Sequence, residues 1–251
     1  NSSTTHDHSK IVPELQVVLD DFIKNDKNSK HQNWRKSVDS ILDISLGKTP
    51  KEFIYNGAFY TPKSFLEMTK FETSNYVTLT SFLHQPFNTT FILNIPDNFS
   101  NGIFYNIELN ELVSEVDNAL KLGYTLAIDC DVSEKTFSSK YGVAVVPKKM
   151  EDQEKCLTYI VEETDISSEF RQQEFENYNT TDDHLMHIVG LVKDQNNKEY
   201  YKVKNSWGTN SDRIGNDGYV YMSKPFFKLK TISVMVHKNG LRENIKKELK
   251  I

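Results

Sequence analysis

The sequence predicts an α+β fold, with a helical first part followed by an antiparallel β half. Near the start of the chain, apolar residues recur at the three- and four-residue spacing of amphipathic helices. In the second half, apolar runs are short, rich in β-branched residues and bounded by turn residues, as is typical of strands. We therefore expect a helical and loop-rich part over residues 1–109 and an antiparallel β half over residues 110–251.

Length and charge narrow the class of protein. With 251 residues and 37% hydrophobic content, the chain can bury a sizeable core. A formal net charge of -5 gives no basic footprint of the kind that nucleic acids require, so we expect no nucleic-acid partner. No apolar run reaches the length of a membrane span, so we expect no membrane partner.

Two helices are predicted in the first part, over residues 11–24 and from Trp34 to Leu42. Gly47 and Pro50 should end the second helix, because proline cannot continue it. Thr61 can cap a short helix that begins at Pro62.

Further along, residues 76–107 show no sustained period and read as loops with a short strand around 91–95. Asn110 is a candidate cap for a helix that Gly123 stops. The remaining elements are a helix near residues 170–178 and strands at 124–129, 141–146, 219–222 and 231–237.

One hairpin carries the candidate chemistry. Two apolar arms, residues 183–190 and 200–205, flank the turn-forming residues Gln195, Asn196 and Asn197. His184 starts the first arm and Asn205 ends the second, so the amide can hold the imidazole in one orientation, as a general base requires. Spacing alone leaves the alternative open that both are ordinary polar residues.

The flanking residues resemble a known family. The segments 184–190, 204–208 and 215–219 are similar to the His and Asn segments of papain-like cysteine peptidases. The resemblance implies that His184 is the general base and acid, that Asn205 orients it, and that the Trp207 ring shields their hydrogen bond from water.

Segments 46–53, 60–65 and 130–133 extend the resemblance, in order, to the bleomycin hydrolase and bacterial aminopeptidase C branch. This implies a partial papain-like fold with a barrel-like catalytic half, a peptide substrate, no cofactor and a homo-oligomer, a hexamer in that family. The sequence itself leaves the compartment unknown, and the resemblance implies a cytoplasmic protein. The chain opens without an initiator methionine, so we expect a trimmed product, and a periplasmic or secreted origin remains open.

The family's nucleophile, a cysteine followed by tryptophan at a helix start, has no counterpart. Cys130 ends an apolar strand, and Cys156 lies in a charged stretch without a helix start, so neither context lowers a thiol pKa. We therefore expect the C-terminal portion of a cysteine aminopeptidase, inactive alone, whose cysteine-bearing N-terminal segment is absent or supplied by another chain. A non-catalytic binding or assembly protein is the alternative. A serine hydrolase is disfavoured, because no Gly-x-Ser-x-Gly motif is present.

Weaker expectations concern the substrate cleft. Asp183 and Leu185 flank His184, and the resemblance implies that they face the substrate cleft with Ile128 near them, although a packing role is equally open. By the same resemblance, the terminal carboxylate of Ile251 would hold the substrate's amino group.

No metal site is expected. His187 should face away from His184, as a core residue, because odd spacing on a strand changes the face. The terminal run His6-Asp7-His8 could bind a metal adventitiously, but a flexible end is the better prediction.

Overall fold

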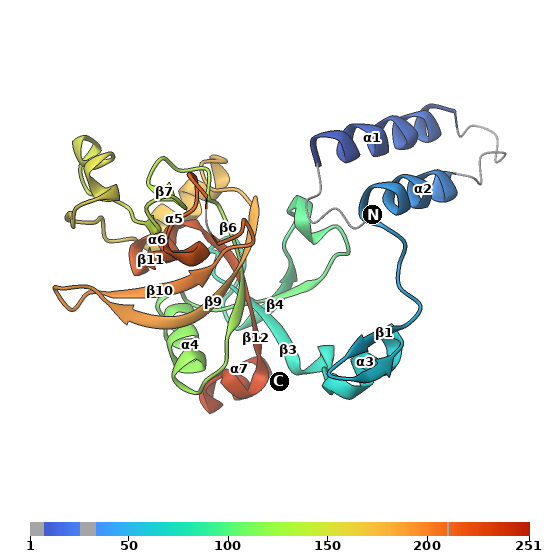
Figure 1. Cartoon of the computed structure of the whole chain (residues 1–251). Helices are drawn as coiled ribbons and strands as arrows, with labels where there is room; N and C mark the ends of the chain where they lie inside the picture. Colours follow the sequence, from blue (N-terminus) through green and yellow to red (C-terminus); the bar gives the residue numbers. More distant parts are fainter. Residues whose placement is uncertain (1–7, 26–33, 210) are drawn as a thin grey trace. The chain divides into compact units, whose positions relative to one another are not determined.

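The computed structural model describes residues 8–25, 34–209 and 211–251, and it divides the chain into two compact units, Asn1–Phe71 and Glu72–Ile251 (Figure 1). His6 and Asp7 lie outside the described residues. The sequence predicted a division after residue 109, whereas the structure places it after Phe71. The reason is that residues 76–106 contribute three hydrogen-bonded strands to the sheet of the second unit.

The first unit begins with two paired helices, as the helical spacing predicted. They are α1 (His8–Asn25) and α2 (Trp34–Leu46), and the rings of Phe22 and Trp34 meet at 5.4 Å between centroids. Gly47 follows α2 with φ of 88°, a left-handed conformation that costs glycine little.

A short hairpin and helix complete this unit. They are β1 (Phe53–Tyr55), β2 (Ala58–Tyr60) and α3 (Pro62–Thr69). Thr61 caps α3 as predicted, since its hydroxyl accepts from the Ser64 backbone N–H while the Ser64 hydroxyl accepts from the Thr61 N–H. The Phe65 ring packs edge-on against Tyr55 and Tyr60, which ties the helix to the hairpin.

The second unit is built on a ten-stranded sheet in the order β4-β5-β3-β12-β6-β9-β10-β11-β8-β7. Its strands are β3 (Tyr76–Thr80), β4 (Thr89–Ile92), β5 (Ile103–Asn106), β6 (Leu126–Cys130), β7 (Phe137–Ser138), β8 (Val143–Ala144), β9 (His184–Lys193), β10 (Glu199–Lys204), β11 (Tyr219–Ser223) and β12 (Thr231–His237). Among the described strand pairs, β3–β5 and β8–β11 are parallel and the others antiparallel. The predicted α+β class with a mostly antiparallel half is confirmed; among the described strands the sheet is open, with β4 and β7 at its edges.

Helices of this unit cover the sheet and close its ends. They are α4 (Leu109–Lys121), α5 (Ser168–Glu176), α6 (Lys224–Lys230) and α7 (Glu243–Leu249). Single 3-10 turns lie in the connections between elements: η2 (Thr73–Asn75), η3 (Pro96–Asn98), η4 (Met150–Asp152), η5 (Lys155–Leu157), η6 (Asn216–Gly218) and η7 (Lys238–Gly240). No helix of the described residues is both long and apolar enough to cross a bilayer.

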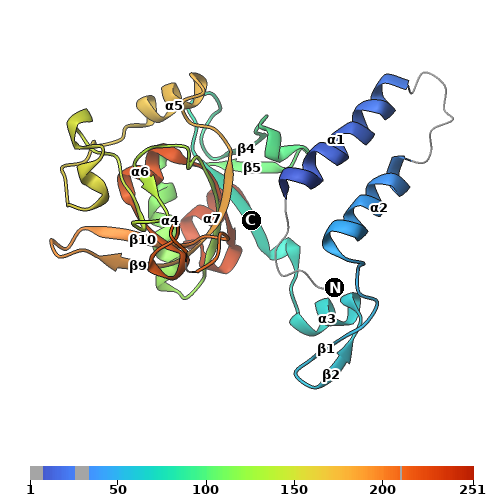
Figure 2. The ribbon, with the colours of Figure 1, turned by 45° about the horizontal axis from the view of Figure 1, so that its top comes forward.

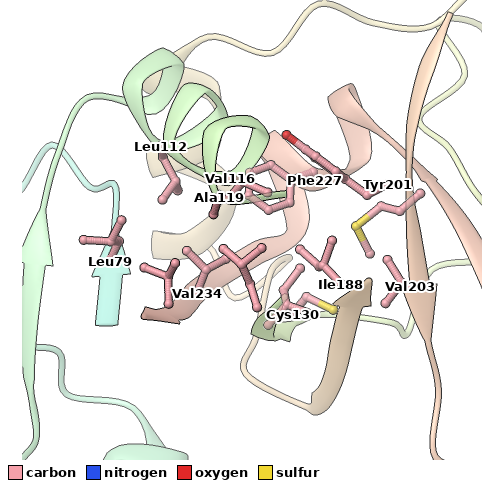
Figure 3. Packing of buried hydrophobic residues seen from close by; sticks show 14 of the residues in the cluster. Leu79, Leu112, Val116, Ala119, Cys130, Ile188, Tyr201, Val203, Phe227 and Val234 are labelled. Atoms are coloured by element: carbon pink, nitrogen blue, oxygen red, sulfur yellow. The ribbon is translucent and has the colours of Figure 1, made fainter. Parts of the chain in front are cut away.

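The main core lies between α4 and the central strands. Figure 3 shows Leu112, Val116 and Ala119 of α4 directed at the strands that carry Ile188 and Val234. All five side chains are fully buried, and burying each of the large aliphatic ones contributes about 1.5–3 kcal/mol. This packing fixes the central strands, and with them the start of β9.

Some predicted boundaries differ from the structure. The α4 helix starts at Leu109 with Glu108 as its N-cap, so Asn110 does not cap it. The predicted strand 141–146 shortens to Val143–Ala144, and α6 was not predicted at all. A short helix leaves little periodicity to read, although Ser223 caps α6 by accepting from the Phe226 N–H.

The C-terminal segment forms α7, which packs beside α4 (Figures 1 and 2). The Arg242 backbone N–H donates to the buried Glu115 carboxylate at 2.8 Å, and the Arg242 guanidinium pairs with the same carboxylate. Ile245 and Leu249 enter the main core. The segment is thus part of the folded body.

We predict that Ile245→Ala destabilises the second unit by about 2–5 kcal/mol, because it leaves a cavity where a fully buried side chain packs. Urea unfolding followed by circular dichroism measures the change. Glu248→Ala, an exposed position on the same helix, is the control and should shift the midpoint little. Equal midpoints for the two variants would mean that α7 is not part of the core.

Candidate active site

The pairing register of β6 and β9 decides which way His184 points. Directly opposite residues of antiparallel strands share a face of the sheet. His184 stands opposite Cys130, and Met186 stands opposite Ile128, so His184 is the last residue on the core-facing side of β9. Its ring therefore lies where the core ends and solvent begins.

The hydrogen bond between His184 and Asn205 is present. The His184 Nε2 and Asn205 Oδ1 atoms are 2.9 Å apart, and Asn205 is 5% exposed. The Ser206 backbone N–H also donates to Oδ1 at 2.7 Å, and this identifies the atom as the amide oxygen. Because that oxygen only accepts, the proton lies on Nε2, and Nδ1 of the neutral ring carries a free lone pair.

An aromatic side chain covers this hydrogen bond. The ring centroids of Trp207 and His184 are 4.7 Å apart, and Phe137 meets the Trp207 ring edge-on at 6.3 Å. The cover lowers access of water to the Nε2–Oδ1 bond, which strengthens it electrostatically. The arrangement can hold one imidazole tautomer and can move a proton at Nδ1.

The loop after Asn205 depends on glycine at one position. The Asn205 N–H donates to the Gly218 carbonyl at 3.0 Å. Gly218 has φ of 75°, and a Cβ there would stand 2.2 Å from the Gly208 oxygen. Only glycine allows this close approach of two backbone segments, so Gly218 helps to fix Asn205.

The segment that leads into β9 is anchored by two buried charges. Asp131 Oδ2 accepts from the Thr181 N–H at 3.2 Å, and Lys230 Nζ donates to the Asn179 carbonyl at 2.6 Å. Asp131 and Lys230 also pair at 3.5 Å. Burial alone would raise the Asp131 pKa, but hydrogen bonds from Ser133 and the nearby Lys230 lower it overall. A charged Asp131 thus holds the backbone just before His184.

Comparison with known proteins decides the family. The Peptidase C1-like family matches residues 21–251, which is nearly the whole chain. The chain belongs to the Peptidase C1-like family. Its relatives place it in the aminopeptidase C branch of the papain-like cysteine peptidases. An aminopeptidase C of Listeria monocytogenes is 26% identical over 241 residues, which cover 88% of this chain and 51% of the relative.

Other relatives agree. An aminopeptidase C of Listeria innocua is 24% identical and is matched over 91% of this chain and 53% of its own length. The solved structure of pepw from Lactobacillus rhamnosis superposes with a TM-score of 0.66 at 17% identity, over 96% of this chain and 56% of that one. The chain therefore shares the fold and spans about half the length of these relatives.

Of the residues expected to line the substrate cleft near His184, Asp183 and Leu185 are exposed, whereas Ile128 is buried. Leu185 is 61% exposed, and Asp183 accepts from the Val132 N–H at 3.0 Å. Burial, followed by the nearby Asp131, raises the Asp183 pKa, while the same Val132 bond and His184 act against that rise. Ile128, expected beside Leu185, is fully buried in the core instead, because it shares its face with Met186.

The C-terminal segment starts well away from His184 along the sheet. His184 is level with Cys130 and Thr231 in the sheet, and β12 then runs six residues to His237 before the chain enters α7. This places the start of the C-terminal segment about 20 Å along the strand. Ile251 packs against the main core.

His187 faces the opposite side from His184, as predicted, but it is exposed and bonds with the Thr125 hydroxyl at 2.8 Å. It is not a core residue. Among the described residues, no cluster of His, Cys, Asp or Glu is arranged to hold a metal ion.

Both cysteines are buried. Cys130 lies in the main core beside Ile188 and Val234 (Figure 3), and burial raises its pKa well above the ordinary value. Burial also raises the pKa of Cys156, whose thiol donates to the Gln153 carbonyl. For both thiols, burial therefore disfavours the thiolate form.

We predict that neither thiol reacts with Ellman's reagent on the minute scale in the native chain, whereas both react in urea. The absorbance change gives the number of reactive thiols directly. If a fast labelling phase appears, its loss in the Cys130→Ser or the Cys156→Ser variant shows which thiol causes it. Rapid native labelling of either cysteine would contradict the assignment of both as buried packing residues.

The sequence did not single out Asp129, which stands opposite Leu185 on the sheet face that carries that exposed side chain. It is 6% exposed, and its Oδ1 has no hydrogen-bond partner among the described residues. Burial raises the pKa of Asp129 to about 7, and the carboxylates of Asp182, Asp97 and Asp183 add to the rise. A lone acidic residue inside the apolar run 124–130 was the available signal.

This buried carboxyl should make stability depend on pH. Unfolded, it has an ordinary pKa of 3.8, so between pH 4 and 7 the unfolded chain releases a proton that the folded chain keeps. The free energy of unfolding therefore falls as pH rises through that window. Asp129→Asn should remove this fall and stabilise the chain at pH 8 by ~1–4 kcal/mol.

Urea midpoints at pH 5 and pH 8 measure the effect, with the exposed Asp165→Asn as the control. An unchanged pH slope in Asp129→Asn would show that another group causes it.

Proposed function

We propose that this chain is the His- and Asn-bearing part of a papain-like cysteine aminopeptidase that hydrolyses peptide bonds. The observation that carries the proposal is the His184–Asn205 hydrogen bond beneath Trp207. Both cysteines of the chain are buried, so the nucleophilic thiol comes from a cysteine-bearing segment outside these 251 residues.

His184 supplies the proton transfers. Its Nδ1 takes the proton of the incoming thiol as sulfur bonds to the peptide carbonyl carbon, and Asn205 stabilises the resulting imidazolium in place. The imidazolium gives the proton to the leaving amine as the C–N bond breaks. Water then hydrolyses the thioester, with His184 as the base again.

Substrate contacts are proposed for Asp183 and Leu185, the exposed residues next to His184 in the chain, although Leu185 points to the face of β9 opposite to the His184 ring. Ile128 and Ile251 pack in or against the core. A substrate limit set by the Ile251 carboxylate is therefore not part of the proposal. Assembly into a homo-oligomer, a hexamer by the family resemblance, stays a prediction.

Alone, the chain should be inactive, and the product of the complete reading frame should cleave aminoacyl-coumarin amides. In that product we predict that His184→Ala lowers kcat/KM by about 10³-fold or more and Asn205→Ala by about 10–10²-fold, since the first removes the base and the second only its orientation. Fluorescence release measures both rates.

His187→Ala is the matched control, an exposed histidine on the same strand with its own hydroxyl partner. It should keep near-normal activity. Unchanged activity in His184→Ala, or a complete product with no hydrolysis and no thiol-probe labelling, would favour a peptidase-like binding protein instead.

A further inference from the structure

A cavity of ≈ 540 Å³ lies next to the segment that leads into His184. It is lined by α5, the loop at η3 and residues 180–182, and its wall includes His84, Phe175, Glu176, Tyr178, Thr180 and Asp182. Asp182 precedes His184 by two residues, so their Cα atoms are at most about 7 Å apart. The cavity wall therefore includes a residue that stands two positions before the proposed catalytic base.

Flat rings form part of this wall. His84 stacks on Phe175 with an interplanar angle of 9° and centroids 6.2 Å apart, and Phe82 packs on the same Phe175 ring at 4.3 Å. Gln172 fixes the assembly, since its side-chain amide lies 3.1 Å from His84 Nδ1 and its oxygen accepts from the Leu83 N–H. Such a rigid surface suits the methylene stem of a side chain and the π-face contact of a cation.

Acidic groups flank these rings. Gln172 Nε2 donates to Glu176 Oε1 at 2.8 Å, so one carboxylate oxygen is oriented while the other has no partner among the described residues. Asp182 Oδ2 accepts from the Asp97 N–H at 2.9 Å, which fixes a second carboxylate in the wall. Buried Thr180 adds a hydroxyl that lacks a partner within the described part of the chain.

The nearby cations do not pair with these two carboxylates. Buried Arg171 lies over the Phe82 ring at 4.6 Å and donates to the carbonyls of Ser81 and Lys228, and Lys230 pairs with Asp131 and Glu134. Neither basic side chain forms an ion pair with Glu176 or Asp182 among the described residues. The carboxylates of the wall are therefore left for a ligand.

We propose that this cavity is a specificity subsite that takes a basic side chain, arginine or lysine, of the peptide substrate. The cationic head lies between Glu176 and Asp182, and the stem lies against Phe175 and His84. Carboxylates recognise a guanidinium by charge-assisted hydrogen bonds, and the aromatic wall adds a cation–π contact. The inference rests on the proposed function, since it names the substrate class of that same site.

Direct binding to the 251-residue chain tests the subsite without any turnover. N-acetyl-arginine amide is titrated against N-acetyl-citrulline amide, its neutral isostere, and chemical shifts of labelled protein report binding. We expect the arginine amide to bind about tenfold more tightly, and added salt to reduce that preference. Equal affinity for the two amides would overturn the proposal.

Variants then locate the site. Glu176→Gln and Asp182→Asn should each remove most of the preference for arginine over citrulline. Glu169→Gln removes the same charge from an exposed position of α5 outside the cavity and should leave the preference intact. A preference that survives in Glu176→Gln and Asp182→Asn would place arginine elsewhere and overturn the assignment.

The experiments test the peptidase function and the basic-residue subsite independently. Loss of hydrolysis in the complete product, with arginine binding intact, counts against the peptidase function alone. Hydrolysis without discrimination between arginine and citrulline counts against the subsite alone.

Discussion

Backbone hydrogen bonds between β6, β9 and β10 are the constraint on which the candidate site depends. They place His184 opposite Cys130, at the end of the core-facing side of the sheet. The β9–β10 register shifts between Lys202 and Val203, and the chain leaves the ladder at Asn205, whose N–H bonds to Gly218 instead. A slip of one residue in either pairing would move the imidazole or the amide to the other face.

The buried polar groups around this ladder are of two kinds: some are fully paired and fix the backbone, and others lack a complete set of hydrogen-bond partners among the described residues. Asp131 and Lys230 are buried and paired, and they hydrogen-bond to the backbone before His184. Their charges therefore hold that segment in place. Asp129 is buried, one of its oxygens has no partner among the described residues, and burial raises its pKa to about 7. Strand β6 and the residue after it thus carry a charged, paired carboxylate and a second carboxyl whose ionisation burial opposes.

The sequence predicted what local pattern determines. The hairpin, His184, Asn205 and the helix cap at Thr61 could be found because each depends on neighbours within a few residues. The sequence did not show that Ile128 points into the core. Alternation along a strand puts Ile128 and Asp129 on opposite faces of the sheet, but it does not tell which face is buried. Strand β3 was missed for a similar reason, because it pairs with β12, more than 150 residues further along the chain, whereas the short strand expected around 91–95 overlaps β4.

The β9–β10 hairpin, which projects from the body in Figures 1 and 2, has one more consequence. Its turn, around Asn197, is the only covalent link between the strand that starts with His184 and the strand that precedes Asn205. Each strand also pairs with a second neighbour, β6 on one side and β11 on the other. A nick in the turn would therefore yield two fragments that each keep half of the imidazole–amide pair, held in register by the rest of the sheet.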